Sequence, residues 1–140
     1  MKRWFLILFA LGLVLGGCRS AKTPELSPHQ VTYEFYRWYI GYPGNPLVDK
    51  EYRSSPYLTP DLIEEIDQTI ASFDKGAYDP ILMAQNIPES FEVDQAETSG
   101  DRSTVIVRLF WGPQSSFTDL EIELVLVENE WKINDIARVD

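Results

Sequence analysis

Strict alternation of apolar and polar residues from position 91 onward limits this 140-residue chain more than any other feature. The alternation runs through four segments, 91–97, 102–111, 117–127 and 131–139. A period of two is typical of half-buried β-strands. The breaks between segments are short and contain turn-forming Gly, Pro, Asn or Asp, which predicts an antiparallel meander. The apolar sets that share a face are Val105, Val107, Leu109 and Trp111 in one segment, and Leu120, Ile122, Leu124 and Leu126 in the next.

Two helices are predicted ahead of the strands. Ser27-Pro28 and Thr59-Pro60 each place a capping hydroxyl before a proline at the first helical position. We expect helices over 28–40 and 60–74, with a loop over 42–55 between them. The first helix has apolar residues on two sides, so it packs on two sides or lines a cavity. Helices followed by strands indicate an α+β fold.

The N-terminus has the form of an export leader. Lys2 and Arg3 precede an apolar run over 4–15, which is the length of a signal-peptide core. The run ends in Leu15-Gly16-Gly17-Cys18, which resembles the bacterial lipobox, with Leu15, Gly16 and Gly17 as the peptidase recognition residues. We expect 1–17 to be a lipoprotein signal peptide, 18–27 the lipidated cysteine and a tether, and 28–140 one α+β domain.

Cys18 is the single cysteine, so no internal disulfide can form. Its thiolate is the nucleophile that takes up a diacylglyceryl group, and two or three acyl chains give a durable membrane anchor. Arg19 follows it, where an aspartate would favour inner-membrane retention. We therefore expect the domain at the outer membrane facing the periplasm in a bacterium with two membranes, or on the outer face of the plasma membrane in a bacterium with one.

Net charge excludes some partners. The chain has 12 Lys+Arg against 22 Asp+Glu, a net charge of −10, and loss of Lys2 and Arg3 with the leader makes this −12. An acidic domain repels both nucleic-acid backbones and anionic headgroups. We expect no nucleic-acid partner and a membrane link that depends on the lipid.

Recognisable catalytic and metal-binding motifs are missing from the sequence. It has one histidine, His29, and neither a G-x-S-x-G elbow nor a Gly-rich phosphate loop. We predict no catalytic residue, no cofactor and no metal. Two acidic sets are expected on solvated faces: Asp61, Glu64, Glu65 and Asp67 on the second helix, and Asp119, Glu121 and Glu123 on a strand.

A pocket could form where the aromatic residues of the first helix meet the 78–88 segment and the last strand. A carboxylate buried there would have a raised pKa, as a general acid or base requires. The alternative is structural: Asp79 and Gln85 would bond loop backbone, and Asp135 would pair with Arg138 or an amide. The pocket candidates are Trp38, Tyr39, Asp79, Gln85, Asp135 and Arg138.

Five short motifs, in order, are similar to those of bacterial envelope lipoproteins of unknown function of the YbjP/YqhG type. They are Phe35-Tyr36-Arg37-Trp38-Tyr39, Tyr57-Leu58-Thr59, Asp79-Pro80, Ala84-Gln85-Asn86-Ile87-Pro88 and Trp131-Lys132-Ile133-Asn134-Asp135-Ile136. Asn134 stands where that family commonly has an acid. The resemblance implies a cone similar to nuclear transport factor 2, with helices cupped against a curved four-stranded antiparallel sheet and a pocket at the wide end.

Fold alone does not decide function in such cones. The first hypothesis is a non-enzymatic envelope module, tethered through Cys18, that docks a protein partner or a small apolar ligand. One alternative is an isomerase or dehydratase with Asp79 or Asp135 as base. Another is an immunity-type inhibitor of a toxin.

Overall fold

The computed structural model describes residues 22–72, 78–112 and 116–139. The predicted signal peptide, the lipobox and Cys18 lie outside the described residues. The elements are α1 (Pro28–Gly41), the 3-10 helix η1 (Glu51–Ser54), α2 (Pro60–Ser72), β1 (Ser90–Val93), β2 (Glu97–Ser99), β3 (Arg102–Phe110), β4 (Phe117–Val127) and β5 (Glu130–Arg138).

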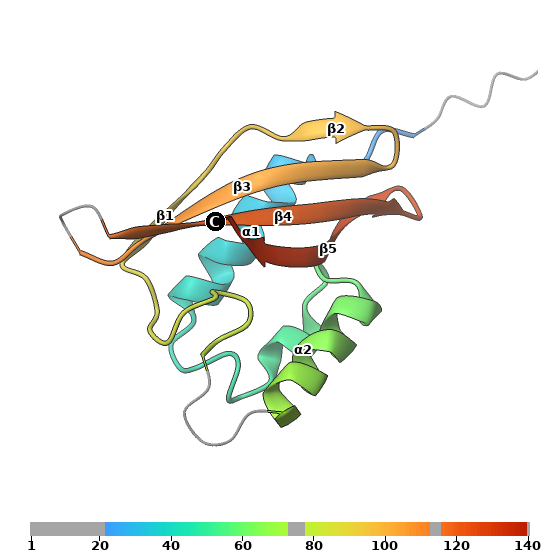
Figure 1. Cartoon of the computed structure of the whole chain (residues 1–140). Coiled ribbons are helices and arrows are strands. Elements are labelled where there is room, and N and C mark those ends of the chain that lie inside the picture. The colour runs from blue at the N-terminus through green and yellow to red at the C-terminus, as the bar shows by residue number, and fades with distance from the viewer. Residues whose placement is uncertain (1–21, 73–77, 113–115, 140) are drawn as a thin grey trace, which may run out of the picture.

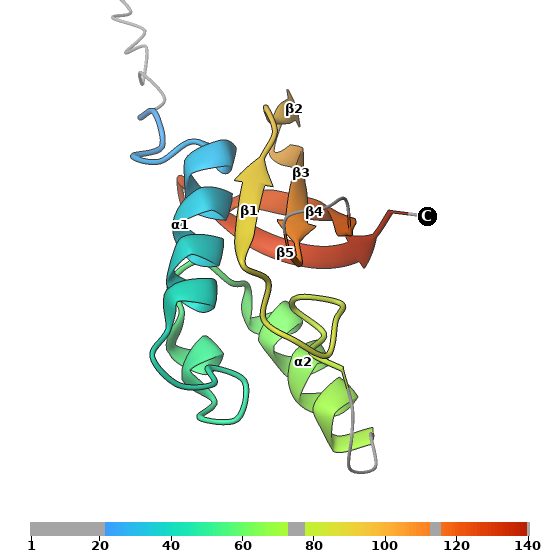
Figure 2. The same cartoon turned by 90° about the vertical axis from the view of Figure 1, so that its left-hand side faces the viewer.

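The fold is α+β, as predicted: helices pack against a curved, open antiparallel sheet (Figures 1 and 2). The strand order is β1-β3-β4-β5, with β2 also paired to β3. Helix α1 lies against one face of the sheet, and α2 lies below it near β5. In Figure 2 no described helix lies on the opposite face, which we call the outer face.

The sheet has five strands rather than the expected four, because the segment predicted as one strand over 91–97 divides. Val93 pairs with Val107 and Glu97 pairs with Thr104. Between these pairs lie three residues, 94–96, on the β1–β2 segment and two residues, 105 and 106, on β3. The extra residue interrupts the ladder in the manner of a β-bulge and separates β1 from β2.

A second irregularity lies in β5. Glu123 pairs with Asp135 while the next residue, Leu124, pairs with Ile133, which leaves Asn134 without a partner across the ladder. This bulge changes which face the following side chains occupy. Trp131 and Ile133 are buried before it, and after it Ile136 is buried while Asp135 is exposed.

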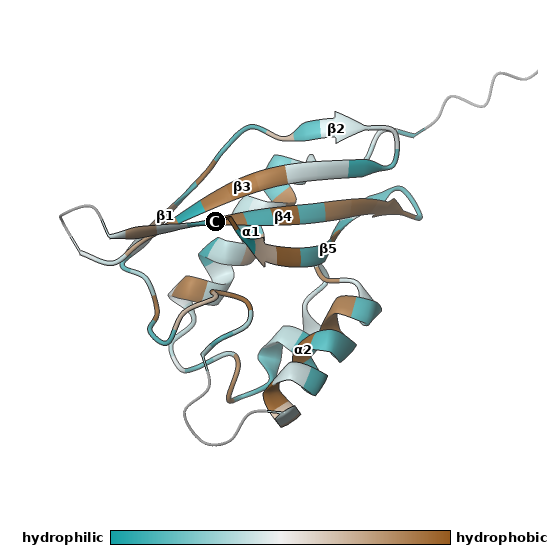
Figure 3. Cartoon of the chain, in the orientation of Figure 1, coloured by the Kyte–Doolittle hydropathy of each residue, from teal (hydrophilic) through white to brown (hydrophobic). Residues whose placement is uncertain are grey.

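The core fills the space between α1, α2 and the inner face of the sheet. Alternation puts the central apolar residues of β3 and β4 inside, as the period of two predicts. Figure 3 shows the brown apolar bands along these strands and on α2. Trp111 and Leu126, predicted for the same face, are only partly buried. The fully buried residues include Phe35, Tyr36, Tyr39, Val105, Val107, Leu109, Leu120, Ile122 and Leu124.

Both helix starts follow the predicted signatures. Ser27 and Gln30 form a capping box at the N-terminus of α1, where the Ser27 hydroxyl accepts from the Gln30 amide and the Gln30 side chain accepts from the Ser27 amide. The Thr59 hydroxyl accepts from the Leu62 amide at the start of α2. Within the described residues no helix is long and apolar enough to cross a membrane.

Candidate functional site

The six pocket candidates do not converge on one cavity. Tyr39 is completely buried and contacts Asp79, which is largely buried. Trp38 is half-buried on the side of α1 and packs its ring against Phe35, Tyr39 and Tyr42. The remaining three candidates, Gln85, Asp135 and Arg138, are exposed. Of the six candidates, Tyr39 therefore contacts Asp79 and Trp38, and the other three lie at the surface.

All three of the described hydrogen bonds to Asp79 come from within the protein. The Tyr39 hydroxyl donates to Oδ2 at 2.7 Å. The amides of Ile81 and Leu82 donate to Oδ1 at 2.7 Å and 3.2 Å. Pro80, which follows Asp79, has no amide to compete for the same oxygen. The carboxylate thus organises the turn that comes directly after it.

The 79–84 turn is fixed to α1 by two tyrosines. Its ends pair through a 2.7 Å bond from the Asp79 amide to the Ala84 carbonyl oxygen. Tyr36, one helical turn before Tyr39, donates its hydroxyl to the Ile81 carbonyl oxygen at 3.1 Å. These bonds give a structural role to two of the aromatic residues in the 35–39 motif and to Asp79.

Burial raises the pKa of the Asp79 carboxyl, and the three hydrogen bonds oppose that shift. Burial, together with the nearby Asp79 charge, also raises the pKa of the Tyr39 and Tyr36 hydroxyls. A raised carboxyl pKa suits a general acid or base only where substrate can reach the group. Here both oxygens are engaged inside the protein, so the arrangement serves the fold.

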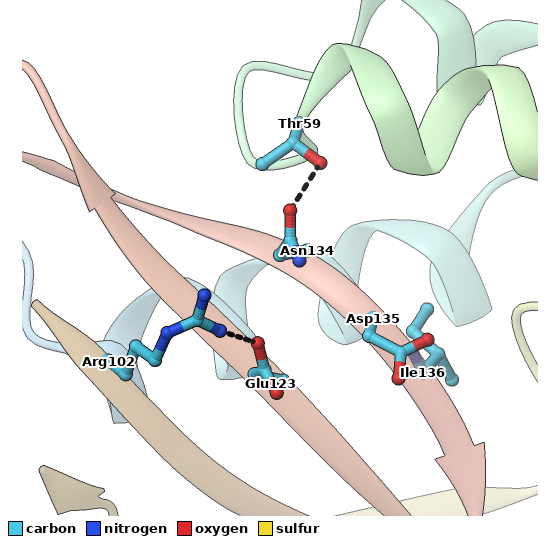
Figure 4. A network of polar contacts seen from close by, with 6 residues as sticks. All are labelled: Thr59, Arg102, Glu123, Asn134, Asp135 and Ile136. Atoms are coloured by element: carbon cyan, nitrogen blue, oxygen red, sulfur yellow. Dashed lines mark hydrogen bonds and ion pairs between the residues drawn. The ribbon is translucent and has the colours of Figure 1, made fainter.

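Asp135 and Asn134 lie at the bulge in β5, shown from close by in Figure 4. The Thr59 hydroxyl and the Asn134 side-chain oxygen are 3.3 Å apart. The backbone reinforces this contact, because the Thr59 amide donates to the Ile133 carbonyl oxygen at 2.9 Å. Asn134 therefore ties the start of α2 to β5, while Asp135 accepts only from the adjacent Ile136 amide among the described hydrogen bonds.

Two of the cavities on the described surface lie side by side along α1. One of about 230 Å³ is lined by Leu26, Val31 and Trp131 among others, and one of about 330 Å³ by Glu34, Arg37 and Trp38 among others. They share Pro56 and Tyr57.

A third cavity of about 130 Å³ lies between α2, Tyr78, Met83 and Asp135. Asp79 lines none of the three. The interior of the cone is instead filled by the aromatic residues of α1.

The acidic residues predicted on a solvated face of α2 differ in their contacts. Asp61, Glu64 and Glu65 are exposed on α2, as expected. Asp67 is partly exposed, and its Oδ1 accepts from the hydroxyl of buried Tyr52 and, at 3.0 Å, from Arg53 Nε, which fixes η1 to α2. The Tyr52 hydrogen bond is the main cause of a lowered Asp67 pKa. Within 22–72, 78–112 and 116–139, no group of three or more His, Cys, Asp or Glu side chains could hold a metal ion.

The outer face of the sheet carries exposed apolar side chains that were not among the predicted site residues. Phe110 and Phe117 are Cα partners across β3 and β4, and Phe117 is 50% exposed. Ile106 also occupies an outward position. The signal was present in the sequence, because apolar residues at outward positions depart from the in-out alternation of a sheet with one solvated face.

No protein-family model and no curated protein matches the chain. The native type VI effector–immunity complex Tae3–Tai3 from Ralstonia pickettii contains a chain with 22% identity and a TM-score of 0.64, over 81% of this chain and 96% of that one. The selenomethionine form of the complex gives 22% identity and a TM-score of 0.62, over 81% and 97%. A Bacteroides thetaiotaomicron protein of unknown function has 25% identity and a TM-score of 0.51, over 75% and 82%. These likenesses establish the α+β fold.

Proposed function

We propose that this chain is a non-enzymatic, protein-binding module of the immunity type, which neutralises a toxin by binding it. The observation that carries the proposal is the likeness to the immunity protein Tai3, which extends over almost the whole length of the neighbouring chain. Immunity by binding requires a stable surface and no reaction, which agrees with a core filled by side chains.

The placement of the carboxylates supports binding over catalysis. An isomerase or dehydratase would need Asp79 or Asp135 in an apolar pocket that a substrate can enter. Asp135 is exposed, and Asp79 is held by Tyr39 and two backbone amides. The broader hypothesis of an envelope module that docks some other protein is kept as the alternative, and the partner's identity separates the two.

The module would act at a membrane surface through a lipid on Cys18. The support is the leader and the Leu15-Gly16-Gly17-Cys18 sequence. Mass spectrometry of the native protein should find Cys18 as the N-terminus with acyl groups. Cys18→Ser should leave the leader attached and remove the lipid mass. An unmodified sulfur in the wild-type chain would contradict the anchor without affecting the binding proposal.

Genetics in the source bacterium tests the immunity role. Deleting the gene should arrest growth when sister cells deliver their toxins, and suppressor mutations should fall in the gene of one toxin. The purified toxin should then bind the intact chain, and expression of the wild-type chain should restore growth. Normal growth of the deletion strain beside toxin-delivering sister cells would overturn the immunity role and leave the envelope-docking alternative.

A further inference from the structure

The outer face of the sheet is a large surface that no described helix covers. Helix α1 contacts β1, β3 and β5 from the other side. Figure 2 shows the sheet with α1 on one side only, and the outer face is the one turned toward the viewer in Figure 1. Along β3 the outward residues are partly exposed while the inward ones are buried. The surface is therefore available to a partner.

One end of this face carries a rigid apolar patch. The Phe110 and Phe117 rings lie 6.4 Å apart between centroids. The Arg108 guanidinium lies 4.6 Å above the Phe117 ring and donates two 2.7 Å hydrogen bonds to Asp119. Val139, which is 43% exposed, lies across from Asp119 in the ladder, since its amide donates to the Asp119 carbonyl oxygen. Aromatic and arginine side chains held in place lose little conformational freedom on binding, which is typical of interface hot spots.

The charges on the same face are unbalanced. Arg108 is paired with Asp119, and Arg102 is paired with Glu123 (Figure 4). Glu121 lies between them on β4, opposite Ile106 on β3 and Ala137 on β5, so neither cross-strand neighbour is a cation. Among the described residues, neither Glu121 nor Asp135 forms an ion pair. A partner that covers Glu121 must supply its counter-charge, because a buried unpaired carboxylate is strongly unfavourable.

From these contacts we infer that the outer face of β3, β4 and β5 docks a partner protein through a patch of apolar side chains ringed by lysine or arginine. The inference rests on the proposed function and specifies which surface binds and what chemistry it recognises. A second copy of this chain is a poor occupant, since two faces that each present Glu121 and Asp135 repel each other. A nucleic acid is excluded by the same charge.

Photo-cross-linking in the source bacterium tests the surface directly, using the full-length chain. A photo-reactive phenylalanine analogue is placed at Phe117 on the outer face, at Tyr57 between the two cavities along α1, or at Val48, which is 72% exposed on the loop before η1. We expect one heterologous protein product from position 117 and none from the other two. The cross-linked peptide of the partner should contain lysine or arginine beside apolar residues.

Charge reversal provides the second arm. Glu121→Lys, combined with the analogue at 117, should lower the yield of that product about tenfold or more, because the partner's basic residue then faces a like charge. The matched control is Glu64→Lys on the exposed side of α2, which should change the yield by less than about twofold. Circular dichroism and thermal unfolding of both variants confirm that they are folded.

Each outcome decides a separate point. The inference would be overturned if position 117 gave no product, or if the products came mainly from Tyr57 or Val48. It would also be overturned by a product made of two copies of this chain, or by a yield that Glu121→Lys does not change. A charge-dependent product from position 117 could also contain a partner other than the toxin identified by the suppressors. That result would support docking at the outer face and contradict the immunity role. Toxin protection with cross-links from another surface would leave the immunity role intact.

Discussion

The Tyr39 hydroxyl donates a 2.7 Å hydrogen bond to Asp79 Oδ2, joining two residues that lie forty positions apart in the chain. Tyr39 is in the last turn of the first helix and Asp79 begins the turn over 79–84. The bond ties this turn to α1 inside the core, together with the bond from Tyr36 to the Ile81 carbonyl oxygen. Burial raises the pKa of this carboxyl, and the hydrogen bond from Tyr39 opposes that shift.

Tyr39→Phe should destabilise the protein because it removes this donor and leaves Asp79 buried with one hydrogen bond fewer. The free energy of unfolding should fall by about 1–3 kcal/mol, the cost of an unsatisfied buried polar group. Urea denaturation measures it. Tyr33→Phe is the matched control, since Tyr33 is 42% exposed, and it should stay within about 0.5 kcal/mol of the wild type. Equal effects of the two variants would contradict the role of the bond.

Comparison of the wild type with Asp79→Asn should show whether ionisation of Asp79 raises or lowers the free energy of unfolding. Burial raises the pKa of this carboxyl in the folded state above its unfolded value. Its contribution to stability is therefore complete below the unfolded pKa and is lost as the pH rises through the folded pKa. The free energy of unfolding of the wild type minus that of Asp79→Asn should fall as the pH rises from about 3 to about 7.

Asp119→Asn should give the opposite slope in the same experiment. The Arg108 hydrogen bonds lower the pKa of Asp119, so its contribution is present above the unfolded pKa and is lost as the pH falls. The wild-type minus variant difference should rise with pH. Denaturation curves at several pH values for both variants test the pair, and slopes of the same sign would show that one of the two assignments is wrong.

Thr59→Ala should weaken the junction between α2 and β5. The Thr59 hydroxyl accepts from the Leu62 amide and lies within hydrogen-bond distance of the Asn134 side chain. Loss of such an N-cap costs about 0.5–2 kcal/mol of stability. Thr59→Ser keeps the hydroxyl and should retain most of the stability in urea or thermal denaturation. A serine variant as unstable as the alanine variant would assign the effect to the methyl group instead.

Gly100→Ala and Gly41→Ala should shift stability in opposite directions. A Cβ at either position meets nothing within 4 Å, so side-chain clashes do not contribute. Gly100 has φ +63°, where alanine costs about 1–2 kcal/mol. Gly41 is the last residue of α1, and alanine there should stabilise by about 0.4–1 kcal/mol through the unfolded chain. Thermal unfolding compares them, and a destabilised Gly41→Ala would contradict this view of the helix end.

Local patterns in the sequence were sufficient to predict most secondary structure. Helix starts depend on a capping hydroxyl and a proline, and strands on a period of two, which are properties of neighbouring residues. The starts at Pro28 and Pro60 and the antiparallel meander are therefore as predicted. The buried alternation of Val105, Val107 and Leu109 follows from the same periodicity.

The tertiary structure decided where the candidate site residues lie. The bulge at Asn134 depends on pairing between β4 and β5, and it turns Asp135 outward and Ile136 inward. A strict period of two would have placed Asp135 on the same face as Ile133. The extra residue that separates β1 from β2 likewise becomes visible only when both segments pair with β3.

The sequence alone is enough to predict the two helix starts, the order of helices before strands and the buried alternation of β3 and β4, because these depend on interactions within a few residues. The hydrogen bond from Tyr39 to Asp79 depends on a helix and a turn that meet across the fold. The outward position of Glu121, between Ile106 and Ala137, likewise depends on how three strands pair. Such contacts depend on register and packing between distant segments, and only the folded chain establishes them.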